Sequence, residues 1–365
     1  MDGTSERQEK HKPKKNIMRM EKLVLRRSVG RQHYLSFLSE PHMIPESNIT
    51  LPFCEGIEEV ECSSCRGLFY FNDFSGKSGV CNLTTNEVKV FDPPRTRGDA
   101  WSSCGLGYDP KSDDYKVIRE HEDSSTAEVF SFKRGSWKTI TGPGYDVDTE
   151  SWFGVYLEAE GRCYWVARPW MDKGDVKLDE YIISFDFSDE TFSRMPLPPQ
   201  PDDGKLLNEL FDFEGCLSVV GYRRVEDHND RLAKYFEVHV WRGGSWKRLF
   251  SVVLVDCQRP LGLRDGRLFL EGRSSKCKHS SPLLHLMTYD WEKEELREHA
   301  KCDMMSPGKM FLLSYVENRV AIPDARPING EKTVLKRKGA SGICHSSSGS
   351  VLKKCTRGVA FPPKS

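Results

Sequence analysis

Short apolar segments separated by turn residues run through most of the chain. Aromatic and β-branched residues cluster in short runs, and dipeptides such as Asp109-Pro110, Gly142-Pro143 and Asp265-Gly266 interrupt them. Such runs bounded by turns are typical of β-strands. No long segment keeps the i, i+3, i+4, i+7 spacing of an amphipathic helix. The pattern predicts an all-β body.

A repeat of about 50 residues organises this body. An apolar strand that ends in a polar or aromatic residue recurs five times, with spacings of 50, 54, 55 and 49 residues. The anchors of these strands are Asn82, Phe132, Asp186, Trp241 and Asp290. A Gly-tipped hairpin precedes most anchors, and a turn with a closing strand follows each of them. Each repeat therefore holds about four strands, the size of one kelch-like propeller blade.

We expect a kelch-like β-propeller of about six four-stranded blades, because each blade can bury its faces only against neighbouring blades. Five blades are predicted from about residue 57 to residue 301. The sixth would use segments 311–316 and 319–322 and be completed by an N-terminal strand at 34–38. A large β-sandwich is the alternative that the strand pattern leaves open.

Both ends of the chain are polar and basic, and the body between them is acidic. Residues 1–30 and 332–365 are predicted to be disordered basic segments, and residues 31–331 the folded domain. Since the whole chain has 54 basic and 54 acidic residues, the body is left net negative. That distribution argues against nucleic acid as a partner, which needs clustered positive charge. It favours a basic protein partner by long-range attraction, or serves solubility alone.

Nothing in the sequence indicates a membrane segment or secretion. Its apolar runs are strand-sized, and no apolar segment follows the charged start as in a signal peptide. The 12 Cys are then expected to be reduced thiols. We expect a cytoplasmic protein, and the basic clusters at 10–15 and 336–338 either add access to the nucleus or are only solvated termini.

No constellation of catalytic or metal-binding residues is recognisable. Cys62 and Cys65 have the spacing of a zinc ligand pair, but no second pair follows at a usable distance. The 10 His are scattered, and the chain has no Gly-x-Ser-x-Gly nucleophile elbow. The sequence therefore predicts no catalytic residue, no cofactor and no metal site, and it disfavours an enzyme built on a propeller scaffold.

The most distinctive run of the chain is GLGYDPKSDDYKV at residues 105–117. It predicts a strand, an Asp-Pro turn and a second strand, with Tyr108 and Tyr115 as a cross-strand aromatic pair. The run resembles the hallmark of the plant F-box-associated (type 1) domain, and the resemblance extends over about residues 51–322. Three further segments resemble motifs of that family: 81–87, 183–198 and 236–247.

The resemblance implies half of a two-part adaptor. In F-box/kelch-repeat and S-locus F-box proteins of plants, an F-box docks on the Skp-type adaptor of an SCF-type cullin–RING ubiquitin ligase, and the β domain binds the protein to be ubiquitinated. Residues 1–50 show no F-box helical pattern. We therefore expect the target-binding half alone, with the Skp-type adaptor and the cullin as partners only if a full-length form carries an F-box. The alternative is a stand-alone interaction module, or a decoy that binds the target without delivering it.

The target is expected to bind at the loops of one rim, as in other propellers. Four long connections are candidates: 92–103, 167–178, 222–234 and 270–282. Three of them contain residue types that dominate protein interfaces. The predicted protein-binding residues are Arg95, Arg97, Trp101, Arg168, Trp170, Met171, Tyr222, Arg223 and Arg224. The alternative for Trp101 and Trp170 is that they pack their own loops.

Two tryptophans test the alignment of the blades. Trp137 and Trp246 follow nearly identical turns, Lys-Arg-Gly-Ser and Arg-Gly-Gly-Ser, and so occupy equivalent positions. We predict that both are largely buried between blades.

Overall fold

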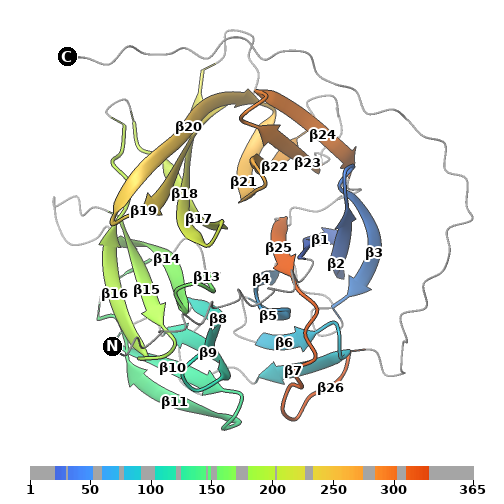
Figure 1. Cartoon of the computed structure of the whole chain (residues 1–365), viewed down its shortest axis with the longest axis vertical. Helices are drawn as coiled ribbons and strands as arrows, with labels where there is room; N and C mark the ends of the chain where they lie inside the picture. The colour runs from blue at the N-terminus through green and yellow to red at the C-terminus, as the bar shows by residue number, and fades with distance from the viewer. Residues whose placement is uncertain are drawn as a thin grey trace, which may run out of the picture.

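A computed structural model of the chain shows a closed ring of six β-sheets (Figure 1). Within the residues that the structure describes, all regular elements are β-strands. The described residues are 21–29, 32–51, 60–73, 78–91, 103–120, 125–144, 147–148, 154–169, 180–201, 204–226, 233–273, 284–301 and 310–328.

Each blade is an antiparallel sheet whose strands follow one another from the axis of the ring outwards (Figure 1). Blade 1 contains β25 (Phe311–Tyr315), β1 (Lys22–Val29), β2 (Gln32–Ser39) and β3 (Ile44–Thr50). Blade 2 contains β4 (Val60–Cys65), β5 (Leu68–Asp73), β6 (Ser78–Asn82), β7 (Glu87–Phe91) and the short β26 (Arg326–Pro327). Blade 3 contains β8 (Cys104–Asp109), β9 (Asp114–Glu120), β10 (Thr126–Ser131) and β11 (Ser136–Thr141).

The other three blades continue in chain order around the ring. Blade 4 contains β13 (Val155–Leu157), β14 (Arg162–Pro169), β15 (Tyr181–Asp186) and β16 (Thr191–Pro196), with β12 (Val147–Asp148) beside the end of β14. Blade 5 contains β17 (Leu207–Phe213), β18 (Cys216–Val225), β19 (Ala233–Arg242) and β20 (Ser245–Val255). Blade 6 contains β21 (Cys257–Arg264), β22 (Arg267–Arg273), β23 (Leu284–Asp290) and β24 (Glu295–Lys301).

The repeat anchors all lie where the third strand of a blade ends. Asn82, Asp186 and Asp290 are the last residues of β6, β15 and β23, Trp241 is the last but one of β19, and Phe132 directly follows β10. One repeat is therefore one blade. The predicted six-bladed propeller is confirmed, and the sandwich alternative is wrong.

The hydrophobic core is divided among the six interfaces between blades, each of which has its own cluster of buried side chains. Between blades 2 and 3, Phe91 of β7 packs edge-on against Phe130 of β10 with ring centroids 4.8 Å apart. No single blade can bury both of its faces, so the blades depend on their neighbours for stability.

Trp137 and Trp246 do occupy equivalent positions, each as the second residue of the fourth strand of its blade. Both contact the preceding blade: Trp137 packs on Phe91 at 5.6 Å between ring centroids, and the Trp246 indole Nε1 donates to the Pro196 carbonyl at 2.9 Å. Both are half-buried, less than predicted. The outermost strand has no neighbour on its outer side, which leaves part of each indole exposed.

Blade 1 is built from both ends of the described chain. β25 pairs with β1, with Val24 opposite Leu313, and β1 pairs with β2. The prediction that 311–316 forms a blade with an N-terminal strand at 34–38 is confirmed, since these residues lie in or beside β25 and β2.

The prediction of disorder over residues 1–30 is wrong for β1, whereas residues 1–20 and 332–365 lie outside the described residues. Only residues 23–25 are consecutively apolar in this strand, and two arginines follow them. Arg26 is nevertheless 1% exposed. Its Nη2 lies 2.8 Å from His33 Nδ1, and its guanidinium lies 5.4 Å from the ring centre of Phe311. Partners on the adjacent strands thus allow a strand with a buried charge.

The segment 319–322, predicted as a strand of the sixth blade, is not a strand. It belongs to residues 316–328, which we call the closing strap, and which run from β25 across blade 2 to β26 at its outer edge (Figure 1). Apolar side chains of the strap, such as Ile322, are buried against the cluster between blades 2 and 3. Residues 319–322 have the apolar pattern of a strand but do not pair with a neighbouring strand, which is why the prediction was wrong.

Side-chain amides hold the closing strap in place. The Asn82 Nδ2 donates to the carbonyl oxygens of Asn318 at 3.0 Å and Val320 at 2.8 Å. The Asn318 Nδ2 donates to the Arg66 carbonyl at 2.7 Å. Gly67 has a φ of +89°, and a Cβ at this position would meet the Val316 carbonyl oxygen. The strap therefore needs glycine at this turn.

The run 105–117 has a structural role, because it joins blade 3 to blade 4. The buried Lys116 ammonium lies 2.9 Å from Asp109 Oδ2 and 2.9 Å from Glu190 Oε1, and donates to the Phe187 carbonyl at 2.8 Å. Burial alone would raise the pKa of the Asp109 carboxyl, but hydrogen bonds from Ser112, Ser188 and Lys116 outweigh burial and hold this pKa well below its usual value. The cluster is therefore fully ionised at neutral pH.

We expect the Asn82→Ala substitution to lower the free energy of unfolding by about 2 kcal/mol, because two partly buried carbonyl groups of the closing strap lose their donor. Urea denaturation measures the change. Asn48→Ala is the control, because its exposed side chain on β3 also makes two hydrogen bonds, with Arg27 and Ser36. It should cost less than about 1 kcal/mol, since water can replace its bonds. Equal losses for the two variants would contradict the role of Asn82 in holding the strap.

We expect Lys116→Met to cost about 3–5 kcal/mol, because it leaves the buried Asp109 carboxylate without its cation and removes one of the cations that pair with Glu190. Lys138→Met is the matched control, since Lys138 also pairs with Glu190 at 2.8 Å but is 53% exposed. An exposed pair contributes at most about 1 kcal/mol. Thermal and urea denaturation should therefore separate the two variants clearly, and similar losses would show that the buried cluster is not a major contributor.

Candidate protein-binding surface

The ring has two different rims. The short-turn rim carries the turns between the first and second strands and between the third and fourth strands of each blade. The long-loop rim, on the opposite side, carries the connections between second and third strands and between blades. All four predicted binding connections start at strand ends on the long-loop rim: Phe91 of β7, Pro169 of β14, Val225 of β18 and Arg273 of β22. The topology thus brings these strand ends to one side of the ring.

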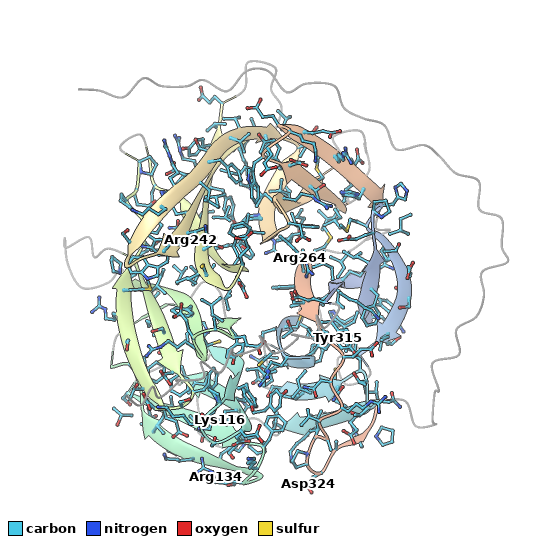
Figure 2. The ribbon with its side chains drawn as sticks, in the orientation of Figure 1. Lys116, Arg134, Arg242, Arg264, Tyr315 and Asp324 are labelled. Atoms are coloured by element: carbon cyan, nitrogen blue, oxygen red, sulfur yellow. The ribbon has the colours of Figure 1, made fainter. Side chains whose placement is uncertain are left out.

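Charged groups on the short-turn rim are paired with one another. Arg242 pairs with Glu214 at 2.9 Å, and Asp324 of the strap pairs with Lys89 at 3.3 Å. The Tyr315 hydroxyl lies 2.7 Å from Thr84 Oγ1. Figure 2 labels six residues of blades 1, 3, 5 and 6 and of the strap: Tyr315, Lys116, Arg134, Arg242, Arg264 and Asp324. Because these groups satisfy each other, this rim is the less suited to a polar partner.

The structure describes only part of the predicted binding set. Five of the nine residues lie outside the described residues: Arg95, Arg97, Trp101, Trp170 and Met171. Arg168 lies on β14 with its backbone opposite Asp148, and its side chain is outside the described part. The structure brings the last three, Tyr222, Arg223 and Arg224, together on β18.

These three residues were predicted in a long connection, and that prediction is wrong. β18 continues to Val225 and β19 begins at Ala233, so that the connection is shorter than 222–234. Residues 167–169 and 270–273 likewise belong to strands β14 and β22. Polar residues such as Arg224 remain in the strand because their backbones are paired with the neighbouring strand of the hairpin. The backbone of Arg224 lies opposite that of Lys234.

A pocket of about 360 Å³ lies at this end of the blade 5 hairpin, beside the first strand of blade 6. Arg223, Arg224 and Lys234 supply its cationic lining. The remaining lining comes from Leu207 of β17, Tyr222, Ala233 and Gln258 of β21. The local sequence gives no sign that Leu207 and Gln258 line a pocket, because only folding brings them there. Lys234 could have been predicted from the sequence, as the basic residue opposite Arg224 in a hairpin.

Tyr222 forms the wall of the pocket and is itself part of the core. It is 8% exposed, its ring stacks on Phe236 with centroids 5.9 Å apart, and its hydroxyl donates to Glu209 Oε1 at 3.0 Å. The Lys234 ammonium lies 5.0 Å from the ring centre and donates to the Gln258 carbonyl. Burial lowers the pKa of this ammonium group and outweighs the opposing charges of Glu271 and Glu209.

A second pocket of about 280 Å³ lies on blade 4 between β15 and β16. Its Arg194 guanidinium stacks 3.7 Å from the ring centre of Tyr181, and Glu180 pairs with Lys205 at 2.7 Å. This pocket is smaller, and its one cationic residue lies beside the carboxylate residue Glu180 in the lining. The pocket between blades 5 and 6 is therefore the better candidate for binding a protein partner.

The described residues contain no candidate site for a metal ion. Among them, no group of three or more His, Cys, Asp and Glu side chains is arranged to hold a metal ion. Cys62 and Cys65 are buried thiols on β4, and burial raises the pKa of Cys65. No helix in the described part of the chain could cross a membrane.

Comparison with protein families identifies the ring. The model of the F-box associated beta propeller domain matches residues 38–225, just over half of the chain. The chain belongs to this family. Its match includes Tyr222 and Arg224 in the pocket, whereas Lys234 and Gln258 lie beyond it.

Relatives of this F-box-associated propeller are plant F-box proteins. An F-box/kelch-repeat protein of Arabidopsis thaliana is 31% identical over 219 residues, which cover 57% of each chain. An F-box/LRR-repeat/kelch-repeat protein of the same plant is 30% identical over 156 residues, 40% of this chain and 42% of that protein. The chain thus spans little more than half the length of the first relative.

Solved structures are more distant. A dihydro-heme d1 dehydrogenase is 12% identical with a TM-score of 0.37, and the match covers 80% of this chain and 74% of that chain. A likeness at this level carries no information about function.

We expect Tyr222→Ala to cost about 3–5 kcal/mol of stability, because the ring is packed in the core between blades 5 and 6. Arg224→Ala should change the melting temperature by no more than about 2 °C, because the side chain is exposed and forms no ion pair with a described residue. Differential scanning calorimetry of both variants checks this. A large loss for Arg224→Ala would mean that Arg224 supports the fold rather than a partner.

Proposed function

We propose that this F-box-associated propeller is the target-binding component of an SCF-type cullin–RING ubiquitin ligase. The observation that carries the proposal is the family match over residues 38–225, together with relatives that are F-box proteins. In such a ligase the propeller holds a target protein, and a Skp-type adaptor and a cullin connect it to the ubiquitin-transferring machinery. We infer a non-catalytic role, in the cytoplasm with access to the nucleus.

The ring suits this role because it is a closed scaffold with two unlike faces. Its short-turn rim is satisfied by internal ion pairs, and its long-loop rim carries an open pocket with cationic lining. A rigid scaffold that presents binding groups from one rim lets the target be held in a fixed orientation.

A second candidate function is a stand-alone interaction module that binds the same target without delivering it. One observation favours it: residues 22–29 and 32–50 form strands and turns of blade 1, so these residues do not form an F-box. Docking to the Skp-type adaptor would then depend on a form of the protein that carries an F-box.

The test compares two tagged proteins in plant cells: this chain, and the same chain preceded by the F-box of the Arabidopsis F-box/kelch-repeat relative. We expect both to recover the same target proteins, and only the fusion to recover the Skp-type adaptor and the cullin as well. The fusion should also shorten the half-life of at least one shared target. Recovery of shared targets whose half-life does not change would overturn the ligase role and leave the interaction module.

A further inference from the structure

Blade 5 is extended on the side of the long-loop rim. Its strands β18, β19 and β20 contain 10, 10 and 11 residues, whereas the corresponding strands of blade 6 contain seven each. The extra length of β18 and β19 carries Arg223 and Arg224 opposite Tyr235 and Lys234. The pocket between blades 5 and 6 is thus built on paired strands, which hold side chains more firmly than a loop does.

The pocket is lined by three cationic residues and by no acidic residue. Arg224 and Lys234 lie opposite each other on β18 and β19, whereas the Arg223 guanidinium lies 5.5 Å from the ring centre of Tyr235. Two carboxylates lie near Lys234, and both have other partners: Glu209 accepts a hydrogen bond from the hydroxyl of Tyr222, and Glu209 and Glu271 each lie 3.5 Å from the guanidinium of Arg259. Because the pocket is a cationic site partly shielded from water, an anion placed there would gain charge-assisted hydrogen bonds.

An apolar surface adjoins these cations. Leu207 at the start of β17 lines the same pocket and is 46% exposed. Large exposed hydrophobic side chains are few among the described residues, and the others lie on outer strands: Ile44 on β3, and Leu249 and Val253 on β20. The pocket therefore combines positive charge with an exposed aliphatic side chain.

We propose that this pocket binds an anionic side chain of the target protein, a carboxylate or a phosphoryl group, while an adjacent aliphatic side chain of the target covers Leu207. The inference rests on the proposed function, since it specifies what the target presents to the propeller. A volume of about 360 Å³ is at the lower end for ligand sites and suits one or two side chains of a peptide. Arg224 and Lys234 bind the anionic oxygens, and Leu207 sets the neighbouring position.

This chemistry is the reverse of the basic partner that the net charge of the body favours. The net charge of the body and the charged lining of the pocket act over different distances. Long-range attraction is screened over a Debye length of about 8 Å at physiological salt, whereas the pocket acts at hydrogen-bond distance. The local lining therefore decides which side chain is bound.

Four fluorescein-labelled peptide pools test the proposal on the full chain by fluorescence anisotropy. Each pool has four random residues, a fixed position, Leu and four more random residues, and the fixed position is phosphoserine, Glu, Ser or Lys. We expect at least one anionic pool to bind about tenfold more tightly than the Ser pool, and the Lys pool to bind most weakly. Preference for phosphoserine alone identifies a phosphoryl group, and comparable binding of the Glu pool identifies a carboxylate.

Arg224→Glu should abolish this preference, while Lys247→Glu, the same charge change at an exposed position of β20, should retain it. Lys234→Gln provides a second variant that decides the matter if Arg224→Glu lowers the melting temperature. Equal binding of the anionic and Ser pools, or a preference that persists in both pocket variants, would overturn the proposal. Co-purification with the Skp-type adaptor does not use the pocket, so failure of the ligase role and failure of this inference are distinguishable.

Discussion

The pairing of β25 with β1 is the constraint on which the rest of the ring depends. It joins Tyr315 to Lys22, about 290 residues away in the chain, and gives blade 1 its innermost strand. Without that strand, the clusters that blade 1 shares with blades 2 and 6 would lose one wall. Because the entropy of closing a loop grows only slowly with its length, this long closure costs little more than a shorter one. The gain is shared by all the blades, since a closed ring leaves no blade with an unpacked face.

The closing strap and the buried Lys116 cluster extend this closure around the ring. Tyr115 and Lys116 are neighbours on β9, yet they act in opposite directions: the Tyr115 hydroxyl accepts a hydrogen bond from Asn318 of the strap, and Lys116 binds Glu190 of blade 4. One short run therefore connects blade 3 to the strap and to the next blade. Because the run 105–117 connects parts of the ring to one another, it identifies the fold and says nothing about the target protein.

The propeller architecture could be predicted from the sequence because its elements repeat. The structural features that could not be predicted occur where the conformation of one segment depends on contacts with a distant segment. Five anchors at equivalent strand ends define a period, and a period is visible without any knowledge of contacts. β1, by contrast, becomes a strand with a buried Arg26 only because His33 and Phe311 face that arginine. At the candidate site, Tyr222 and its two arginine neighbours were selected by residue type; all three line one pocket, and their role in binding stays a prediction. The strands that supply the rest of the lining are positioned by the register of the blade 5 hairpin and by the packing of blade 6 on blade 5. Local sequence patterns predict neither the register nor the packing.

The path of the strap also fixes where the described chain enters and leaves the ring. β1 begins at Lys22 beside Tyr315, and the strap ends at Ile328, whose amide donates to the Asn86 carbonyl in a turn of blade 2. Both points lie on the short-turn rim, so a domain or a solid support joined at either one would face away from the pocket. The two would be separated by the thickness of the ring, about 20 Å for a six-residue strand. A protein immobilised directly at either of these points would therefore present the pocket on the side opposite the support.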